Sequence, residues 1–137
     1  MSSVEYVSLK KEKYIGTDYR KLNIPEHYKS NIAQVLKTCE EADISSQINQ
    51  ILLFGSCAKQ TTHKGSDIDI LIITDNQLDS RNKAEFIYLV NSKLIDDIDV
   101  DIIFYTVNSY LDGEMPLTKA IKKSNLVLYK RGDKFGI

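Results

Sequence analysis

Two aspartates inside an apolar run constrain the fold of this chain more than any other feature. Residues 52–54 are apolar, Gly55 and Ser56 follow, and ten residues later Asp67 and Asp69 alternate with isoleucines in a second apolar run. Alternation with a period of two indicates a β-strand whose successive side chains point to opposite faces. The isoleucine face is therefore expected in the core, and both carboxylates are expected together on the other face.

A pair of carboxylates on one strand face needs a compensating group. Two unit negative charges about 4 Å apart repel by roughly 4 kcal/mol at an effective dielectric near 20. Asp99 and Asp101 repeat the arrangement in a third predicted strand, over 98–106, and the nearest basic residue to the first pair is Lys64 in the preceding turn. A raised pKa, a basic partner or a hard divalent cation would relieve the repulsion. Oxygen ligands without His or Cys favour Mg²⁺, with Mn²⁺ as the alternative.

The Gly55-Ser56 pair supplies a place for an anion beside such a cation. Magnesium in proteins is commonly held by one or two carboxylates together with substrate phosphates, which points to a nucleoside triphosphate. Gly55 permits close approach of the backbone, Ser56 offers a hydroxyl, and a helix starting there directs free N–H groups at a phosphate. We therefore expect phosphate at the Gly-Ser pair and a bridging metal at the aspartates.

The rest of the pattern predicts an α/β fold. Helices are expected from residue 25 to about 43, over 55–60, from 79 or 80 to 94, and over 116–123, and strands over 49–54, 66–73, 98–106 and 125–129. This alternation indicates a small mixed β-sheet with helices packed on it, and the helix 79–94 is expected on the isoleucine face. Residues 1–23 show no firm period; we treat them as an arm of uncertain structure in the same domain as 24–137, with a docked strand or turn favoured and a partner-binding arm as the alternative.

Charge and composition exclude several partner classes. The 18 basic and 19 acidic residues leave a formal net charge of −1, so no global field attracts nucleic acid or a membrane surface. No run approaches the roughly 20 apolar residues that a spanning helix needs, and we predict a cytoplasmic protein. Cys39 and Cys57 are too few and too far apart for a disulfide framework or zinc site, and Cys57 is expected to be a buried thiol.

Taken together, these motifs resemble those of the minimal nucleotidyltransferases of the DNA polymerase beta superfamily. The family's motif of Gly-Ser, ten residues and Asp-x-Asp is matched with its spacing intact by Gly55, Ser56, Asp67 and Asp69. The family's third aspartate lies in a later strand of the form Val-Asp-apolar-apolar, which residues 100–103 match at Asp101. The resemblance covers about 52–106, and 125–129 looks like the family's closing strand. It implies the polymerase beta-like nucleotidyltransferase fold.

The resemblance also implies roles for these residues. Asp67 and Asp69 would bridge two metal ions, and Asp101 would hold the metal beside the acceptor hydroxyl and assist its deprotonation. Asp99, two residues earlier on the same face, competes with Asp101; we prefer Asp101 because its apolar sequence neighbours predict a costly buried charge. Gly55 and Ser56 would seat the β and γ phosphates of the triphosphate, with Lys64 as a weaker neutralising contact.

Family members of this length resemble antitoxins that transfer AMP from ATP to a tyrosine of a HEPN-type toxin, which makes a protein hydroxyl the preferred acceptor. Transfer to a small molecule such as an aminoglycoside is the alternative, with a homodimer completing the acceptor pocket. A third hypothesis is a non-catalytic module that neutralises a partner by contact. Replacing buried acids with apolar residues would stabilise a pure scaffold, so the retained aspartates argue against this hypothesis.

Overall fold

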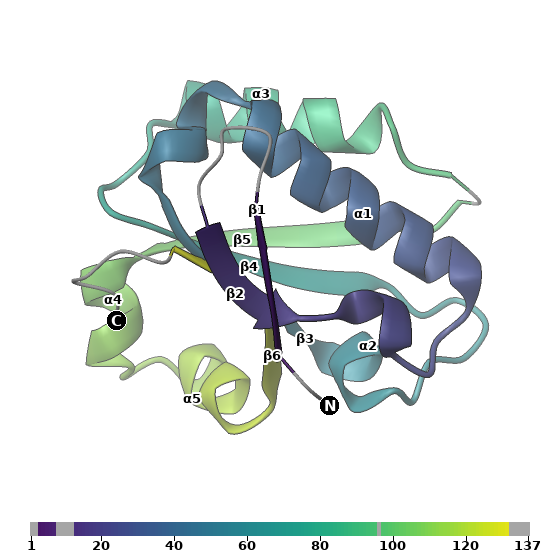
Figure 1. Cartoon of the computed structure of the whole chain (residues 1–137). Coiled ribbons are helices and arrows are strands. Elements are labelled where there is room, and N and C mark those ends of the chain that lie inside the picture. The colour runs from purple at the N-terminus through teal and green to yellow at the C-terminus, as the bar shows by residue number, and fades with distance from the viewer. Residues whose placement is uncertain (1–2, 8–12, 96, 132–137) are drawn as a thin grey trace.

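The computed structural model describes residues 3–7, 13–95 and 97–131, and these form one mixed sheet with helices around it (Figure 1). The strands are β1 (Ser3–Val7), β2 (Lys13–Thr17), β3 (Ile48–Phe54), β4 (Ile68–Thr74), β5 (Val100–Thr106) and β6 (Asn125–Arg131). The helices are α1 (Glu26–Glu41), α2 (Gly55–Lys59), α3 (Ser80–Asn91), α4 (Val107–Asp112) and α5 (Pro116–Lys123), with 3-10 turns η1 (Tyr19–Lys21) and η2 (Asp43–Gln47). The sheet order is β1-β2-β6-β3-β4-β5. The predicted fold class, a small mixed α/β sheet, is confirmed.

The register of the central strands brings the strand ends that carry the predicted site residues together. Strands β3 and β4 are antiparallel, so Phe54 at the end of β3 pairs with Asp69 near the start of β4. Strands β4 and β5 are parallel and pair Asp69 with Asp101. A parallel pair requires a crossover, which α3 provides. The end of β3 and the starts of β4 and β5 therefore meet at one end of the sheet.

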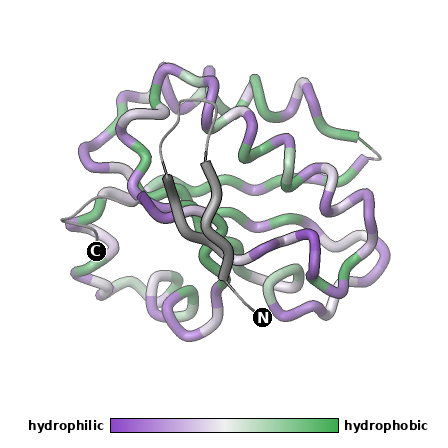
Figure 2. The backbone as a smooth tube through the Cα atoms, in the orientation of Figure 1, coloured by the Kyte–Doolittle hydropathy of each residue, from purple (hydrophilic) through white to green (hydrophobic). Residues whose placement is uncertain are grey.

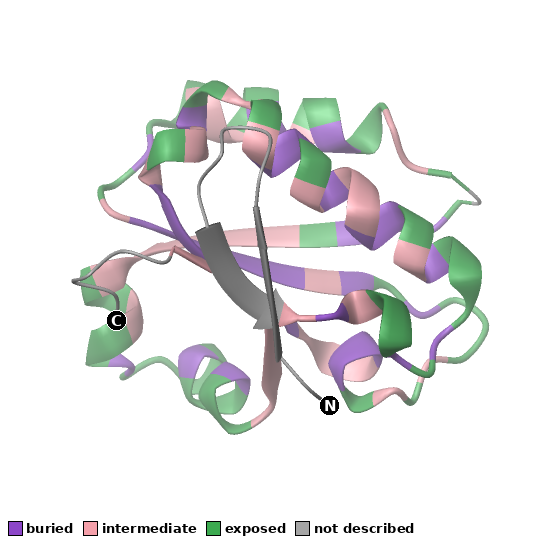
Figure 3. Cartoon of the chain, in the orientation of Figure 1, coloured by how far each residue is buried: buried purple, intermediate pink, exposed green. Residues whose placement is uncertain are grey.

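One face of the sheet is covered by α1 and α3, which Figure 1 shows lying along it. Ile68, Ile70 and Ile72 belong to the core cluster on this face, together with Phe86 and Val90 of α3. Figure 2 shows hydrophilic and hydrophobic residues alternating along α1, and Figure 3 shows buried residues recurring on that helix and along β4. The prediction that the helix beginning near residue 80 packs on the isoleucine face is confirmed.

The opposite face carries a smaller apolar cluster over only part of its length. Leu52, Leu71, Ile73 and Ile121 are its buried members, and Tyr105 and Tyr110 pack at its margin. Leu71 and Ile73 share a strand face with Asp69. Val107 and Tyr110 of α4 and Ile121 of α5 cover the apolar half of this face, and the half that carries the carboxylates is left open.

Helix α4 and the two 3-10 turns were not predicted. Strands β1 and β2 lie in the arm for which a docked strand or turn was favoured, without bounds. Strand β2 pairs with β6 through Tyr14↔Arg131 and Ile15↔Lys130 and so extends the sheet. The domain division at residue 24 stays a prediction. None of the helices in the described segments is both long and apolar enough to cross a membrane.

Candidate active site

Asp69 and Asp101 are the centre of the candidate site. They are direct partners across the β4–β5 ladder, so their side chains leave the same face of the sheet from adjacent strands. Asp67 lies just before β4, and it is close enough to Asp69 for its charge to act on that carboxylate. Asp69 is half-buried, while Asp67 and Asp101 are exposed. The structure thus brings the three predicted metal ligands to one open patch at the sheet end.

The expected burial of Asp101 is wrong. Its neighbour Val100 is buried, but Asp101 itself is exposed because it points to the open half of the other face. Apolar neighbours in sequence lie on the opposite face of a strand, so they do not bury a residue between them.

The charges of the three carboxylates act on one another. The pKa of Asp69 is raised above its usual value by burial first, and then by the negative charges of Asp101 and Asp67. Asp99 is not among the charges that raise it within the described residues. The effect on Asp69 favours Asp101 over Asp99 as the third carboxylate of the site. The reason is its proximity to Asp69, and not the burial that the sequence predicted.

Gly55 fits against the Asp69 carboxylate. Its φ is +72°, in the left-handed region, and a Cβ built on it would overlap Oδ2 of Asp69 and lie 3.1 Å from that residue's Cγ. Only glycine combines this backbone conformation with this close approach. The pair predicted to hold phosphate is therefore immediately beside the carboxylate at the centre of the site.

Ser56 and Cys57 lie in the first turn of α2. Phe54 is the N-cap of this helix, so Ser56 is not the capping residue. Cys57 is fully buried, its thiol donates to the carbonyl oxygen of Asp67 at 3.6 Å, and burial raises its pKa to about 11. A thiol protonated at neutral pH is a poor nucleophile, and the expected buried thiol is confirmed.

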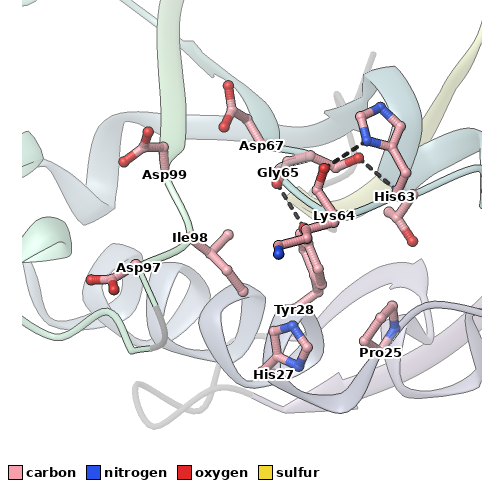
Figure 4. A pocket seen from close by; sticks show the side chains of 12 residues that line it. Pro25, His27, Tyr28, His63, Lys64, Gly65, Asp67, Asp97, Ile98 and Asp99 are labelled. Carbon is pink, nitrogen blue, oxygen red and sulfur yellow. Dashed lines mark hydrogen bonds between the residues drawn. The ribbon is translucent and has the colours of Figure 1, made fainter.

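Lys64 lines the same pocket as Asp67, and the Gly-Ser pair lies outside that pocket. Lys64 is exposed, and the pocket, which Asp99 also lines, has a volume of about 580 Å³ (Figure 4). The phosphate contact expected of Lys64 stays a prediction. The sequence analysis missed the pocket itself, which also uses Tyr28 and Asp97; the run of acids before β5 was the signal in the sequence.

The three carboxylates offer the oxygen ligands that a hard cation prefers, but in this structure their oxygens do not converge into a complete coordination site. Within the described residues, no three His, Cys, Asp or Glu side chains converge closely enough to hold a metal ion. Asp67 and Asp101 are exposed, however, so rotation about their own side-chain bonds redirects their oxygens. Neighbouring like charges without a counter-charge favour such divergence, and a divalent cation would reverse it.

These features provide an electronegative patch of oxygen donors beside a glycine that lets a ligand approach the backbone. Such a patch suits a cation carrying phosphate groups. Burial raises the pKa of both Cys39 and Cys57, so neither cysteine of this chain is an activated thiol.

Comparison with solved structures places the fold among toxin–antitoxin proteins. A chain in a crystal structure of a toxin–antitoxin complex with AMP-PNP is 25% identical, with 73% of each chain covered and a TM-score of 0.56. A mutant of the toxin–antitoxin complex MntA-HpeT matches at 24% identity over 73% of each chain, with a TM-score of 0.54. The tri-AMPylated Shewanella oneidensis HEPN toxin in complex with its MNT antitoxin matches at 23%, covering 74% of this chain and 71% of the other, with a TM-score of 0.50. No curated protein is significantly similar to the chain.

The model of the family described as "Polymerase beta, Nucleotidyltransferase" matches residues 31–134. This match includes Gly55, Ser56, Asp67, Asp69 and Asp101, and so contains the whole candidate site. The chain therefore belongs to the polymerase beta nucleotidyltransferase family.

Proposed function

We propose that this protein is a magnesium-dependent adenylyltransferase that moves AMP from ATP to a hydroxyl group of a partner protein, a HEPN-type toxin. The observation that carries the proposal is the pairing of Asp69 with Asp101, beside Gly55, in a chain of the nucleotidyltransferase family. The family supplies the reaction class. The proximity of the carboxylates to Gly55 supports a site for a cation and phosphate.

One of the solved structures supports the choice of nucleotide and partner. The complex at 25% identity is a toxin–antitoxin pair with AMP-PNP, an ATP analogue, which supports ATP as substrate and a toxin as partner. Transfer of AMP to a HEPN toxin is the chemistry named for the Shewanella oneidensis complex, which at 23% identity shows the fold alone. The acceptor is accordingly the finer part of the proposal.

Each residue has a role in this proposal. The Gly55-Ser56 turn seats the triphosphate, since Gly55 has no side chain to block the approach and Ser56 adds a hydroxyl. The acceptor oxygen forms a bond to the α-phosphorus, the bond to the bridging oxygen breaks, and pyrophosphate leaves. Asp101, exposed at the β5 edge of the patch, accepts the proton from the acceptor hydroxyl. Magnesium held by Asp67, Asp69 and Asp101 would neutralise charge on the phosphate oxygens.

Transfer of labelled AMP tests the proposal directly. The protein is incubated with Mg²⁺ and ATP labelled at the α-phosphate, together with the product of the adjacent gene, and label on that protein is the expected result. The matched variant is Asp67→Asn combined with Asp69→Asn, which keeps side-chain volume and removes both charges; it is expected to give no label. Label on an aminoglycoside instead would contradict the protein acceptor. Tight complex formation without any label, unchanged in the variant, would contradict the enzyme.

A further inference from the structure

The pocket of about 580 Å³ beside Asp67 has no assigned ligand. It lies between the first turn of α1, the turn that precedes β4 and the segment that leads into β5 (Figure 4). Its volume is within the range of about 300–1,000 Å³ that is typical of small-ligand sites. The pocket is therefore large enough to receive a substrate group.

The position of the pocket relative to the carboxylates indicates which of the two substrates it receives. The sheet order β3-β4-β5 places Gly55 on one side of Asp67 and Asp99 on the other, and the amide of Ile68 donates to the carbonyl oxygen of Asp99 at 2.9 Å. The pocket is lined by the start of α1, the turn before β4 and the segment that leads into β5, which includes Asp99, whereas Gly55 and Ser56 do not line it. In phosphoryl-group transfer the attacking and leaving oxygens lie roughly in line on opposite sides of phosphorus. With the leaving pyrophosphate at Gly55-Ser56, the attacking group comes from the side of the pocket.

The charge of the pocket wall selects a cation. Asp67, Asp97, Asp99 and Lys64 line it, all four are exposed, and none of them forms an ion pair within the described residues. Figure 4 shows the Lys64 amine in the space between the turn and the segment that leads into β5. With His27 and His63 of the wall counted as neutral, three negative charges and one positive charge leave a local excess of two negative charges, or of one when Asp67 holds magnesium, whereas the whole chain carries only −1. Such an uncompensated local field attracts a positively charged ligand.

The rest of the wall is mixed: Tyr28 and Ile98 give an apolar surface, and His27, Thr62, His63 and Ser66 are polar. Tyr28 is buried, and its hydroxyl donates to the carbonyl oxygen of Ser66 at 2.8 Å, which holds the ring in place. Ile98 is also buried beside it. Asp97 has a φ of +52°, a conformation that Asp and Asn adopt more readily than most residues. An apolar surface below carboxylates fits an arginine or lysine, whose aliphatic stem and charged head need both surfaces.

We propose that this pocket binds the acceptor polypeptide through an arginine or lysine side chain close to the hydroxyl that receives AMP, with Asp97 and Asp99 as specificity-determining residues. The inference rests on the proposed function, because it assigns the second substrate of the same site. It adds a sequence requirement to the acceptor: a cationic residue must flank the modified hydroxyl.

Two fluorescent peptides test the proposal with the full-length protein. One carries a tyrosine flanked by arginines, and its twin has glutamines in their place. Fluorescence anisotropy without nucleotide is expected to show about tenfold tighter binding of the arginine peptide, and the preference should weaken with added salt because the charges are exposed. Transfer of labelled AMP in the presence of Mg²⁺ and ATP is expected to show the same preference.

Substitutions in the pocket supply the second half of the test. Asp97→Asn keeps a residue suited to the left-handed backbone and should reduce the preference severalfold, and adding Asp99→Asn should abolish it. The matched control, Asp112→Asn with Glu114→Gln, removes two exposed negative charges outside the pocket and should keep the full preference.

Three results would overturn the inference. One is equal binding of both peptides to the wild-type protein; another is a preference that survives Asp97→Asn with Asp99→Asn. The third is loss of ATP affinity in Asp97→Asn with unchanged peptide binding, which would assign the pocket to the nucleotide.

The transfer assay separates failure of this inference from failure of the proposed function. If label goes to an aminoglycoside and to neither peptide, the acceptor is not a polypeptide and the inference fails as well. Charge-dependent peptide binding without transfer to any acceptor would support the cation site and refute the proposed function, so the two failures are distinguishable.

Discussion

Gly55 and Asp69 depend on each other through a contact that leaves no room for a side chain. Gly55→Ala would place a Cβ against Oδ2 of Asp69 and would also force alanine into φ +72°. Gly65 is the natural control, because its φ is +88° but a Cβ there meets nothing within 4 Å. Gly65→Ala is expected to destabilise by about 1–2 kcal/mol from backbone strain alone. Gly55→Ala should cost clearly more in urea denaturation and should also abolish AMP transfer. Equal losses in the two variants would show that the contact with Asp69 is unimportant.

The ionised carboxylate of Asp69 has an unfavourable environment when no cation is bound. Burial and the charges of Asp101 and Asp67 raise its pKa, so its ionised form opposes folding at neutral pH. In metal-free buffer at pH 7, Asp69→Asn is therefore expected to raise the melting temperature, by the equivalent of about 1 kcal/mol or less because water screens the half-exposed group. Asp75→Asn is the control with the opposite sign, since Arg131 lowers the pKa of Asp75. A lower melting temperature for Asp69→Asn would contradict the repulsion.

At the level of single residues, the sequence predicted which aspartates meet but not how they are exposed. Asp67 and Asp69 were predicted to lie together; Asp67 lies just before β4, and its charge acts on Asp69. The predicted phosphate and metal positions require the Gly-Ser pair to be near the aspartates, and Gly55 does meet Asp69. The exposure of Asp101 depends on where α4 and α5 end over that face, which no local pattern encodes.

Strand β6 is tied to the end of β4 by a bidentate ion pair. Arg131 donates from Nη2 to Oδ1 of Asp75 at 2.6 Å and from Nη1 to Oδ2 at 2.8 Å. These hydrogen bonds hold the pKa of Asp75 below its usual value of 3.8, so their contribution to stability is present above that pH and is lost as pH falls through the lowered value. Both side chains are partly exposed, and the contribution is about 1 kcal/mol or less.

Arg131→Gln should therefore lower the free energy of unfolding at pH 7 and should match the wild-type protein at a pH below the lowered pKa of Asp75. Urea denaturation at the two pH values measures this difference. Arg81→Gln serves as the control, because the Arg81–Glu85 pair is more exposed and its loss should have little effect at either pH. A constant deficit for Arg131→Gln at both pH values would show that packing, and not the ion pair, is responsible.

Elements with a strong hydrophobic period were predictable, and short or edge elements were not. Helix α1 and strands β3, β4 and β5 follow the predicted ranges within about two residues at most of their ends. Helix α4 has only six residues, too few to show a period; its signals were Thr106, whose hydroxyl accepts from the amide of Ser109, and Gly113 in the left-handed region. Strand β2 pairs with the end of β6, which is distant in sequence, and the residue pattern of 13–17 does not indicate this tertiary contact.

On the scale of the whole molecule, the sheet divides its two faces between stability and chemistry. One face is buried under α1 and α3, and the other is covered by α4 and α5 only over its apolar half. The uncovered half holds Asp69 and Asp101 at the end of the sheet where β3, β4 and β5 meet. A cation with bound nucleotide at this end would contact only the open half of the carboxylate face and would leave the core undisturbed.

Calorimetric titration of AMP-PNP into the metal-free protein, with and without Mg²⁺, tests the central claim most directly. The account predicts heat of binding for the wild-type protein only when Mg²⁺ is present, and loss of that heat in Asp67→Asn combined with Asp69→Asn. Binding of the same strength without Mg²⁺, or in that variant, would contradict a metal site built from these carboxylates.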